Sequence, residues 1–193
     1  MRHVAIVQGH PDPAGGHLCH ALADAYATGA TGAGHGVTRV DIAGLDVPPL
    51  RNKTEFESGI LPPGLEAARD AIASSEHVVI VFPLWLGTMP AALKAFLEQM
   101  MRPGVAFAYR KDAMPRKLFG GRSAHVVVTM AMPALAYRWV YGAHGVRGLE
   151  RSILNFVGIK PVRKTYLGMA EGSDEARRSG WIARLHADGS RLR

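Results

Sequence analysis

The chain has 193 residues, 48% of them hydrophobic and 20% charged, and a formal net charge of +7 from 23 Lys and Arg against 16 Asp and Glu. This length and balance suit one domain, residues 1–193, with a substantial core, and they exclude a wholly disordered chain. The basic residues form no run of five, and no apolar stretch approaches the ~20 residues of a membrane-spanning helix, so we expect neither nucleic-acid binding nor membrane insertion.

The cysteine content and the N-terminal residues indicate the cellular compartment in which we expect the protein. Cys19 is the one cysteine, which excludes an internal disulfide framework and fits a reducing environment. The apolar run that starts at Val4 is too short for the core of a signal peptide. We therefore expect a cytoplasmic protein. No His, Cys and carboxylate cluster has metal-ligand spacing, so no metal is expected.

Short β-branched runs alternate with helical patterns along the chain. The runs predict strands at Val4–Val7, Val37–Ile42, His77–Phe82, Ala124–Met130 and Val162–Leu167. The helical patterns cover Leu18–Tyr26, Leu65–Ile72, Pro90–Met100 and Val146–Phe156, and a last helix begins with Ser173 as its cap. Strands that are apolar on both faces are typical of a parallel sheet covered on both sides.

This alternation predicts an α/β fold with a doubly wound, five-stranded parallel sheet in the order 2-1-3-4-5. Such sheets bind ligands beyond the carboxyl ends of their strands. A ligand would therefore contact the three loops that follow the first, third and fourth strands. The stretches Ala43–Pro63 and Arg102–Gly121 are expected to be irregular.

The loop after the first strand runs from Gln8 to His17 and enters a helix. Glycines and a helix N-terminus offer backbone N–H groups to a phosphate, with help from the side chains of His10 and His17. The loop is neither a Walker loop nor the Gly-x-Gly-x-x-Gly dinucleotide turn. The alternative is a turn that prolines and glycines merely shape.

The loop after the third strand, Pro83 to Pro90, is apolar, although connections at a sheet edge are normally polar. A flat aromatic ligand lying on this loop explains its composition. Burial of ~300 Å² of ring would contribute ~7 kcal/mol. The alternative is a loop packed in a dimer or in the core.

The loop after the fourth strand runs from Val128 to Pro133 and is followed by Tyr137, Trp139, Tyr141 and His144. The hydroxyl of Thr129 and nearby N–H groups suit the polar edge of a ring. The alternative is that these aromatic residues only pack. Three unusual loops at one predicted edge of the sheet are stronger evidence for a ligand site than any one of these loops alone.

The segments Gly9–Pro13, Phe82–Lys94 and Arg102–Phe107 resemble the NAD(P)H:quinone oxidoreductase family, which includes DT-diaphorase and modulator-of-drug-activity-like proteins. Gly121–Ala124 leading into Thr129–Met130, and Gly158–Val162, also resemble its bacterial members. The resemblance covers nearly the whole chain. It implies a flavodoxin-like fold, a homodimer with flavin sites at the interface, and NAD(P)H-dependent ping-pong hydride transfer to quinone-like acceptors.

The resemblance also implies roles for individual residues. By motif, the phosphate end of the flavin would be held by His10 and the turn from Ala14 through Gly16 and His17 to Leu18. The isoalloxazine ring would be supported by Pro83, Leu84, Trp85, Leu86 and Gly87. The pyrimidine side of the ring would be reached by Thr129, Met130, Ala131 and Met132.

Two further elements carry over. Phe107 and Tyr109 match the aromatic loop that walls the acceptor pocket. Gly142–Gly145 resembles the Gly-x-His-Gly segment of the family, in which a histidine, here His144, and an upstream tyrosine assist hydride transfer by stabilising negative charge. The spacing leaves both Tyr137 and Tyr141 as candidates for that tyrosine.

The sequence departs from the family pattern in two places. Gly15, Gly16 and His17 stand where members often carry serine, phenylalanine and asparagine, so side-chain donors for the phosphate are missing. Ala131 stands where many members place glycine. The short chain favours FMN over FAD, and NADH and NADPH stay open as donors. Two other classes remain possible: a regulatory flavin-binding subunit of a potassium efflux system, and a flavodoxin-type electron carrier.

Overall fold

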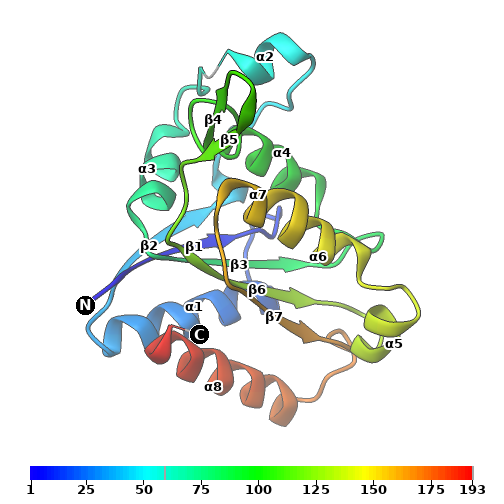
Figure 1. The fold of residues 1–193 in the computed structure, drawn as a ribbon. Coiled ribbons are helices and arrows are strands. Elements are labelled where there is room, and N and C mark those ends of the chain that lie inside the picture. Colours follow the sequence, from blue (N-terminus) through cyan, green and yellow to red (C-terminus); the bar gives the residue numbers. More distant parts are fainter. Residues whose placement is uncertain (59, 193) are drawn as a thin grey trace.

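The computed structural model describes residues 1–58 and 60–192. Its main sheet has five parallel strands in the order β2-β1-β3-β6-β7 (Figure 1). These strands are β1 (His3–Gln8), β2 (Gly36–Asp41), β3 (His77–Pro83), β6 (Ser123–Thr129) and β7 (Val162–Leu167). The predicted doubly wound α/β sheet in the order 2-1-3-4-5 is therefore confirmed, and each strand boundary differs from the prediction by at most one residue.

Helices cover both faces of the sheet (Figure 1). One face carries α1 (Leu18–Gly32) and α8 (Glu175–Arg191). The other face carries α3 (Glu66–Ser74), α4 (Ala91–Met100) and the continuous segment α6 (His144–Gly148), η2 (Leu149–Leu154) and α7 (Asn155–Val157). Alternate side chains of each strand enter the two cores: Val79 and Val81 face α1, whereas Val78 and Ile80 face α4.

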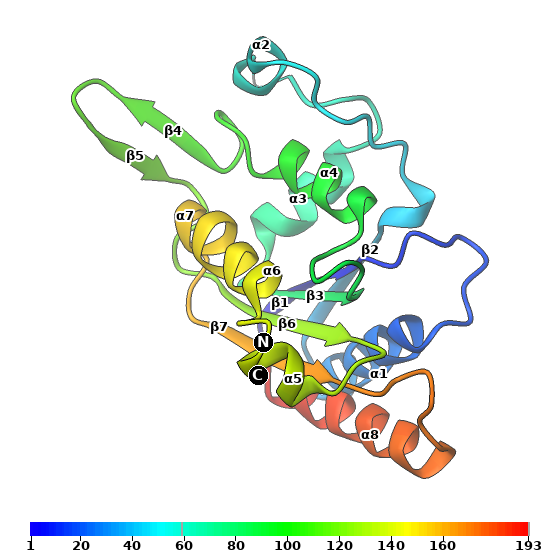
Figure 2. The ribbon, with the colours of Figure 1, turned by 90° about the vertical axis from the view of Figure 1, so that its right-hand side faces the viewer.

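Several elements differ from the sequence expectations. The stretch expected to be irregular contains a hairpin of β4 (Phe107–Arg110) and β5 (Ala113–Lys117), which extends away from the sheet (Figure 2). Short helical turns form at η1 (Ile42–Gly44), α2 (Lys53–Glu57) and α5 (Ala134–Trp139). The last helix is capped by Asp174, which accepts a hydrogen bond from the Arg177 N–H, and not by Ser173, whose hydroxyl donates to the Ala170 carbonyl.

Helices α1 and α8 approach each other closely through glycine. A Cβ atom on Gly29 would overlap the carbonyl oxygen of His186, and one on Gly189 would overlap the carbonyl oxygen of Tyr26. Asp188 of α8 also accepts a hydrogen bond from Arg163 of β7 at 2.7 Å. The C-terminal helix is thus joined to both the first helix and the edge of the sheet.

Candidate active site

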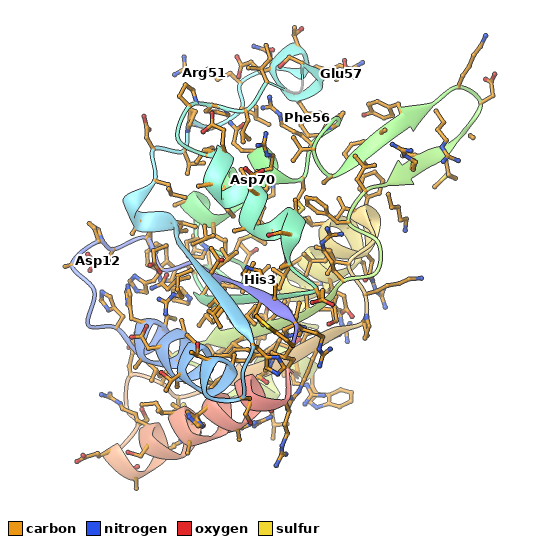
Figure 3. The ribbon with its side chains drawn as sticks, turned by 90° about the vertical axis from the view of Figure 1, so that its left-hand side faces the viewer. His3, Asp12, Arg51, Phe56, Glu57 and Asp70 are labelled. Carbon is orange, nitrogen blue, oxygen red and sulfur yellow. The ribbon has the colours of Figure 1, made fainter. Side chains whose placement is uncertain are left out.

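The loop between β1 and α1 lies at the carboxyl end of the sheet, and Figure 3 shows Asp12 at this end and His3 at the other end of β1. Gly9 donates its N–H to the Val81 carbonyl at 2.7 Å, which anchors the loop to β3. The Asp12 carboxylate then receives the Ala14 N–H at 2.9 Å and contacts His17 Nε2 at 2.7 Å. These bonds hold the loop in one shape.

Three imidazole rings gather at this loop. Those of His10 and His17 are stacked with centroids 3.8 Å apart, and that of His20 lies 5.5 Å from His10. Burial, followed by the neighbouring rings of His17 and His20, lowers the pKa of His10. Hydrogen bonds from His17 and from the Ala14 N–H lower the pKa of Asp12. Among the described residues, no group of three or more His, Cys, Asp or Glu side chains is arranged to hold a metal ion.

The N-terminus of α1 lacks the usual neutralising groups. His17 is its N-cap, with extended backbone and no capping hydrogen bond from its side chain, and the first turn contains no acidic residue. The His20 N–H donates to the His17 carbonyl at 2.9 Å, and the N–H groups of Leu18 and Cys19 at the start of the turn can bind an anion, which the helix dipole also favours. The predicted residues Ala14, Gly16, His17 and Leu18 lie at or just before this helix end. This arrangement fits a phosphate group.

The loop after β3 folds into a tight turn. Trp85 and Thr88 exchange two backbone hydrogen bonds of 2.9 and 3.0 Å, and the residues between them, Leu86 and Gly87, have φ angles of +47° and +79°. Leucine rarely adopts this left-handed conformation. The side chain of Leu86 is fully exposed and that of Trp85 is half exposed. The turn therefore presents apolar side chains outward, as a binding surface for a flat ring requires.

Trp85 connects the two loops. Its ring meets that of His10 edge to face at a centroid distance of 6.1 Å, and it also lines a large cavity. The predicted Pro83 and Leu84 lie just before it, and Leu84 donates its N–H to the Thr129 carbonyl at 2.8 Å. The histidine cluster and the apolar turn are therefore neighbours.

The loop after β6 lies beside them but contributes differently from the expectation. The Thr129 hydroxyl is buried and lies 3.3 Å from Cys19 Sγ of α1. Met130 is buried, whereas Ala131 is exposed and Met132 is partly exposed. Burial raises the pKa of the Cys19 thiol to about 11. None of Thr129, Met130, Ala131 and Met132 lines the large cavity.

That cavity, of about 1000 Å³, lies between the β3–α4 loop, α4, the hairpin and the segment from α6 to α7. Predicted residues that line it are Trp85, Leu86, Phe107, Tyr109 and His144. Sequence reasoning missed Phe56, which is labelled in Figure 3, and Phe156. Phe107 packs against Phe156 at 4.9 Å and against Tyr109 at 5.3 Å between centroids, so aromatic rings form one wall. The volume accommodates a planar ring system together with a second small molecule.

The two candidate tyrosines occupy different environments. Tyr137 is buried, its hydroxyl donates to the Gly87 carbonyl at 3.0 Å, and it accepts the Val146 N–H at 3.3 Å. Burial raises the pKa of Tyr137. Tyr141 is exposed, and neither ring lines the cavity. Tyr137 thus joins the β3–α4 turn to the helix that carries His144.

A glycine brings this helix against the turn. A Cβ atom on Gly145 would overlap the Gly87 carbonyl oxygen and would lie 2.7 Å from Cα of Thr88. Ala143, at the N-cap of α6, has a φ angle of +49°. The positions of His144 and of the turn are therefore coupled.

In the described part of the chain, no helix is long and apolar enough to span a bilayer.

Comparison with known proteins agrees with this architecture. The FMN-dependent NADH:quinone oxidoreductase of Ruegeria pomeroyi is 33% identical over 97 residues, 46% of this chain and 48% of that protein, so the match spans about half the length of that relative. The protein of the same name from Shewanella baltica is 27% identical over 172 residues, 80% of this chain and 81% of that one. The solved NAD(P)H:quinone oxidoreductase of Methanothermobacter marburgensis is 21% identical with a TM-score of 0.81, covering 99% of this chain and 96% of that one.

A family model described as a flavodoxin-like fold matches residues 2–187. This range includes all five strands of the sheet, the three loops at its carboxyl edge and most of α8. The chain therefore belongs to the flavodoxin-like fold family.

Proposed function

We propose that this chain is an FMN-dependent oxidoreductase that takes electrons from NAD(P)H and passes them to a quinone-like acceptor. The observation that carries the proposal is the large apolar cavity next to an uncapped helix N-terminus with clustered histidines. The names of the Ruegeria, Shewanella and Methanothermobacter relatives support the same activity.

Different residues would hold the phosphate and the planar ring of the flavin. Backbone N–H groups at the start of α1, with His10 and His17, would bind the phosphate. The turn around Leu86 and the ring of Trp85 would support the planar ring by apolar contact. When bound, FMN supplies the two-electron chemistry that amino-acid side chains lack.

The side chains that line the cavity would leave room for the acceptor and assist hydride transfer. Its aromatic wall of Phe107 and Phe156 would shield a bound ring from water and leave space for a flat acceptor. His144 lines the same space, where its imidazole would donate a hydrogen bond toward negative charge that develops during hydride transfer. Tyr137 would act by positioning, because its hydroxyl is bonded to Gly87 and Val146.

A homodimer is part of this proposal. Two large apolar side chains that line the cavity, those of Leu86 and Tyr109, are exposed. A second copy would cover such a surface and complete the open side of the cavity. We also propose that the protein acts in the cytoplasm, which its single, buried and unpaired Cys19 suits.

Two measurements test the activity. Purified protein would be denatured and the released nucleotide identified, with FMN as the expected result. The native protein would then be mixed with NADH or NADPH and a benzoquinone, and oxidation of the nucleotide followed by its absorbance. Protein that binds no added FMN, or that oxidises neither nucleotide in the presence of the quinone, would contradict the proposal.

A further inference from the structure

A second, basic pocket lies on the side of α6–η2 that faces away from the large cavity. Its volume is about 300 Å³, and it is enclosed by the end of α5, by α6–η2 and by strand β7 at the edge of the sheet. Its principal side chains are those of Arg138, Trp139, Arg147, Arg151, Lys164 and Tyr166. From the same helical segment, His144 and Gly148 face the large cavity, so the two pockets are distinct.

Positive charge in this pocket exceeds negative charge. Lys164 forms an ion pair with Glu150, so these two charges compensate each other. Within the described residues, Arg138, Arg147 and Arg151 have no acidic partner, which leaves three uncompensated guanidinium groups around one hollow. Arg147 and Arg151 lie four residues apart on one helix, where like charges repel. An anion bound between them would relieve this repulsion.

The other side chains of the pocket indicate which chemical group carries the anion. Arg138 lies over the ring of Tyr166, with its guanidinium carbon 5.8 Å from the ring centroid, and this contact holds the charge at the wall of the pocket. Trp139 lines the rim with an indole that is 76% exposed. An exposed indole beside arginines suits a planar base carried by a phosphate ester.

The geometry points to a phosphomonoester site in this pocket: Arg138, Arg147 and Arg151 bind the phosphate of a nucleotide whose base stacks on Trp139. The planar guanidinium fork matches phosphate oxygens in pairs, which a lysine ammonium does not. This inference goes beyond the proposed oxidoreductase activity, because phosphate binding here uses no residue of the large cavity.

The test measures binding directly by isothermal titration calorimetry at low salt. The protein, loaded with one equivalent of FMN, is titrated with 2′-AMP, with 5′-AMP and with adenosine. The double variant with Arg147→Gln and Arg151→Gln should bind at least one of the two phosphates at least about tenfold more weakly than the unchanged protein. Adenosine, which lacks the phosphate, should bind to neither protein measurably.

A matched control removes the same charge elsewhere. Arg116→Gln and Lys160→Gln replace two exposed basic residues that do not line the pocket, and this variant should bind the phosphates like the unchanged protein. Circular dichroism of the single Arg151→Gln variant and of the unchanged protein shows whether the substitution alters the fold. Weaker binding with an unchanged spectrum is then a loss of binding and not of folding. The inference is overturned if neither phosphate binds to the unchanged protein, if adenosine binds as tightly as the phosphates, or if the control weakens binding as much as the double variant.

The phosphate has two possible sources, which kinetics distinguish. If it is the 2′-phosphate of NADPH, the double variant should raise KM for NADPH at least about fivefold and leave KM for NADH unchanged. If it belongs to a free mononucleotide, both KM values should stay unchanged while binding of 5′-AMP is lost. Either result supports the site. Because the primary measurement is binding, an inactive enzyme would contradict the proposed function without deciding this inference.

Discussion

The imidazole rings of His10 and His17 lie face to face, 3.8 Å apart between centroids and inclined by 15°. His17 Nε2 also lies 2.7 Å from the Asp12 carboxylate, whereas His10 Nδ1 accepts the Asp12 N–H at 3.2 Å. Burial lowers the pKa of His10, so the loop combines a buried imidazole of lowered pKa with one that is hydrogen-bonded to an acid. A phosphate at the start of α1 would meet the side chain of His17, the N-cap residue of this helix.

Removing the His17 side chain tests this arrangement. His17→Ala should raise the dissociation constant of FMN about tenfold, which is the effect of one charge-assisted hydrogen bond. Riboflavin, which has no phosphate, should bind to both proteins equally, as measured by quenching of flavin fluorescence. His186→Ala is the control, because His186 is exposed on α8. Equal loss of affinity for both flavins would contradict a phosphate contact.

His144 should matter for rate more than for cofactor binding. His144→Ala removes the imidazole from the cavity wall, so reduction of the bound flavin by NAD(P)H should slow about 100-fold in stopped-flow absorbance. The dissociation constant of FMN should change less than about twofold. Tyr141→Phe, at an exposed ring outside the cavity, provides the comparison. An unchanged rate in His144→Ala would remove this residue from the mechanism.

His77 should make stability depend on pH. Its ring is buried between the Tyr26 hydroxyl at 3.0 Å and the Ser123 hydroxyl at 2.7 Å, and burial, with smaller effects from His125 and Arg2, lowers its pKa to about 4. Between the ordinary value of about 6.5 and this value, the unfolded chain binds a proton that the folded chain does not. Stability contributed by neutral His77 is therefore complete above that window and is lost as the pH falls through it.

The expected loss from this residue is about 3 kcal/mol between pH 7 and pH 4. Urea denaturation of the unchanged protein and of His77→Gln at several pH values isolates the effect, since carboxylates titrate in both. The difference in unfolding free energy between the two proteins should shrink as the pH falls. Curves that stay parallel across the range would show that His77 does not titrate as expected.

The contact between α1 and α8 should depend on Gly29. In Gly29→Ala the added methyl group overlaps the His186 carbonyl oxygen, so the helices must separate, and we expect a loss of about 1–3 kcal/mol in unfolding free energy. Gly32→Ala on the same helix is the matched control. A Cβ atom there meets nothing within 4 Å, so this change should be neutral or slightly stabilising. Equal effects of the two substitutions would contradict the close approach.

Much of the fold was predictable because its signals are local. His77 to Phe82 is a continuous apolar run because β3 is covered on both faces, and this run alone predicts an interior parallel strand. The hairpin from Phe107 to Lys117 escaped prediction, since its apolar residues do not alternate regularly with polar ones and it packs little of its length against the core. The cap of α8 was misplaced by one residue because Ser173 and Asp174 are both suitable caps.

The sequence by itself determined the order of elements, the apolar turn after β3 and the glycine-rich entry to α1, since each depends on neighbouring residues. Only the tertiary structure decided which side chains meet. Phe56, Phe107 and Phe156 come from distant segments to form one wall, and the Tyr137 hydroxyl is bonded to Gly87, 50 residues away. Such partners are set by how helices and loops pack on the sheet, and no short-range pattern in the chain encodes that packing.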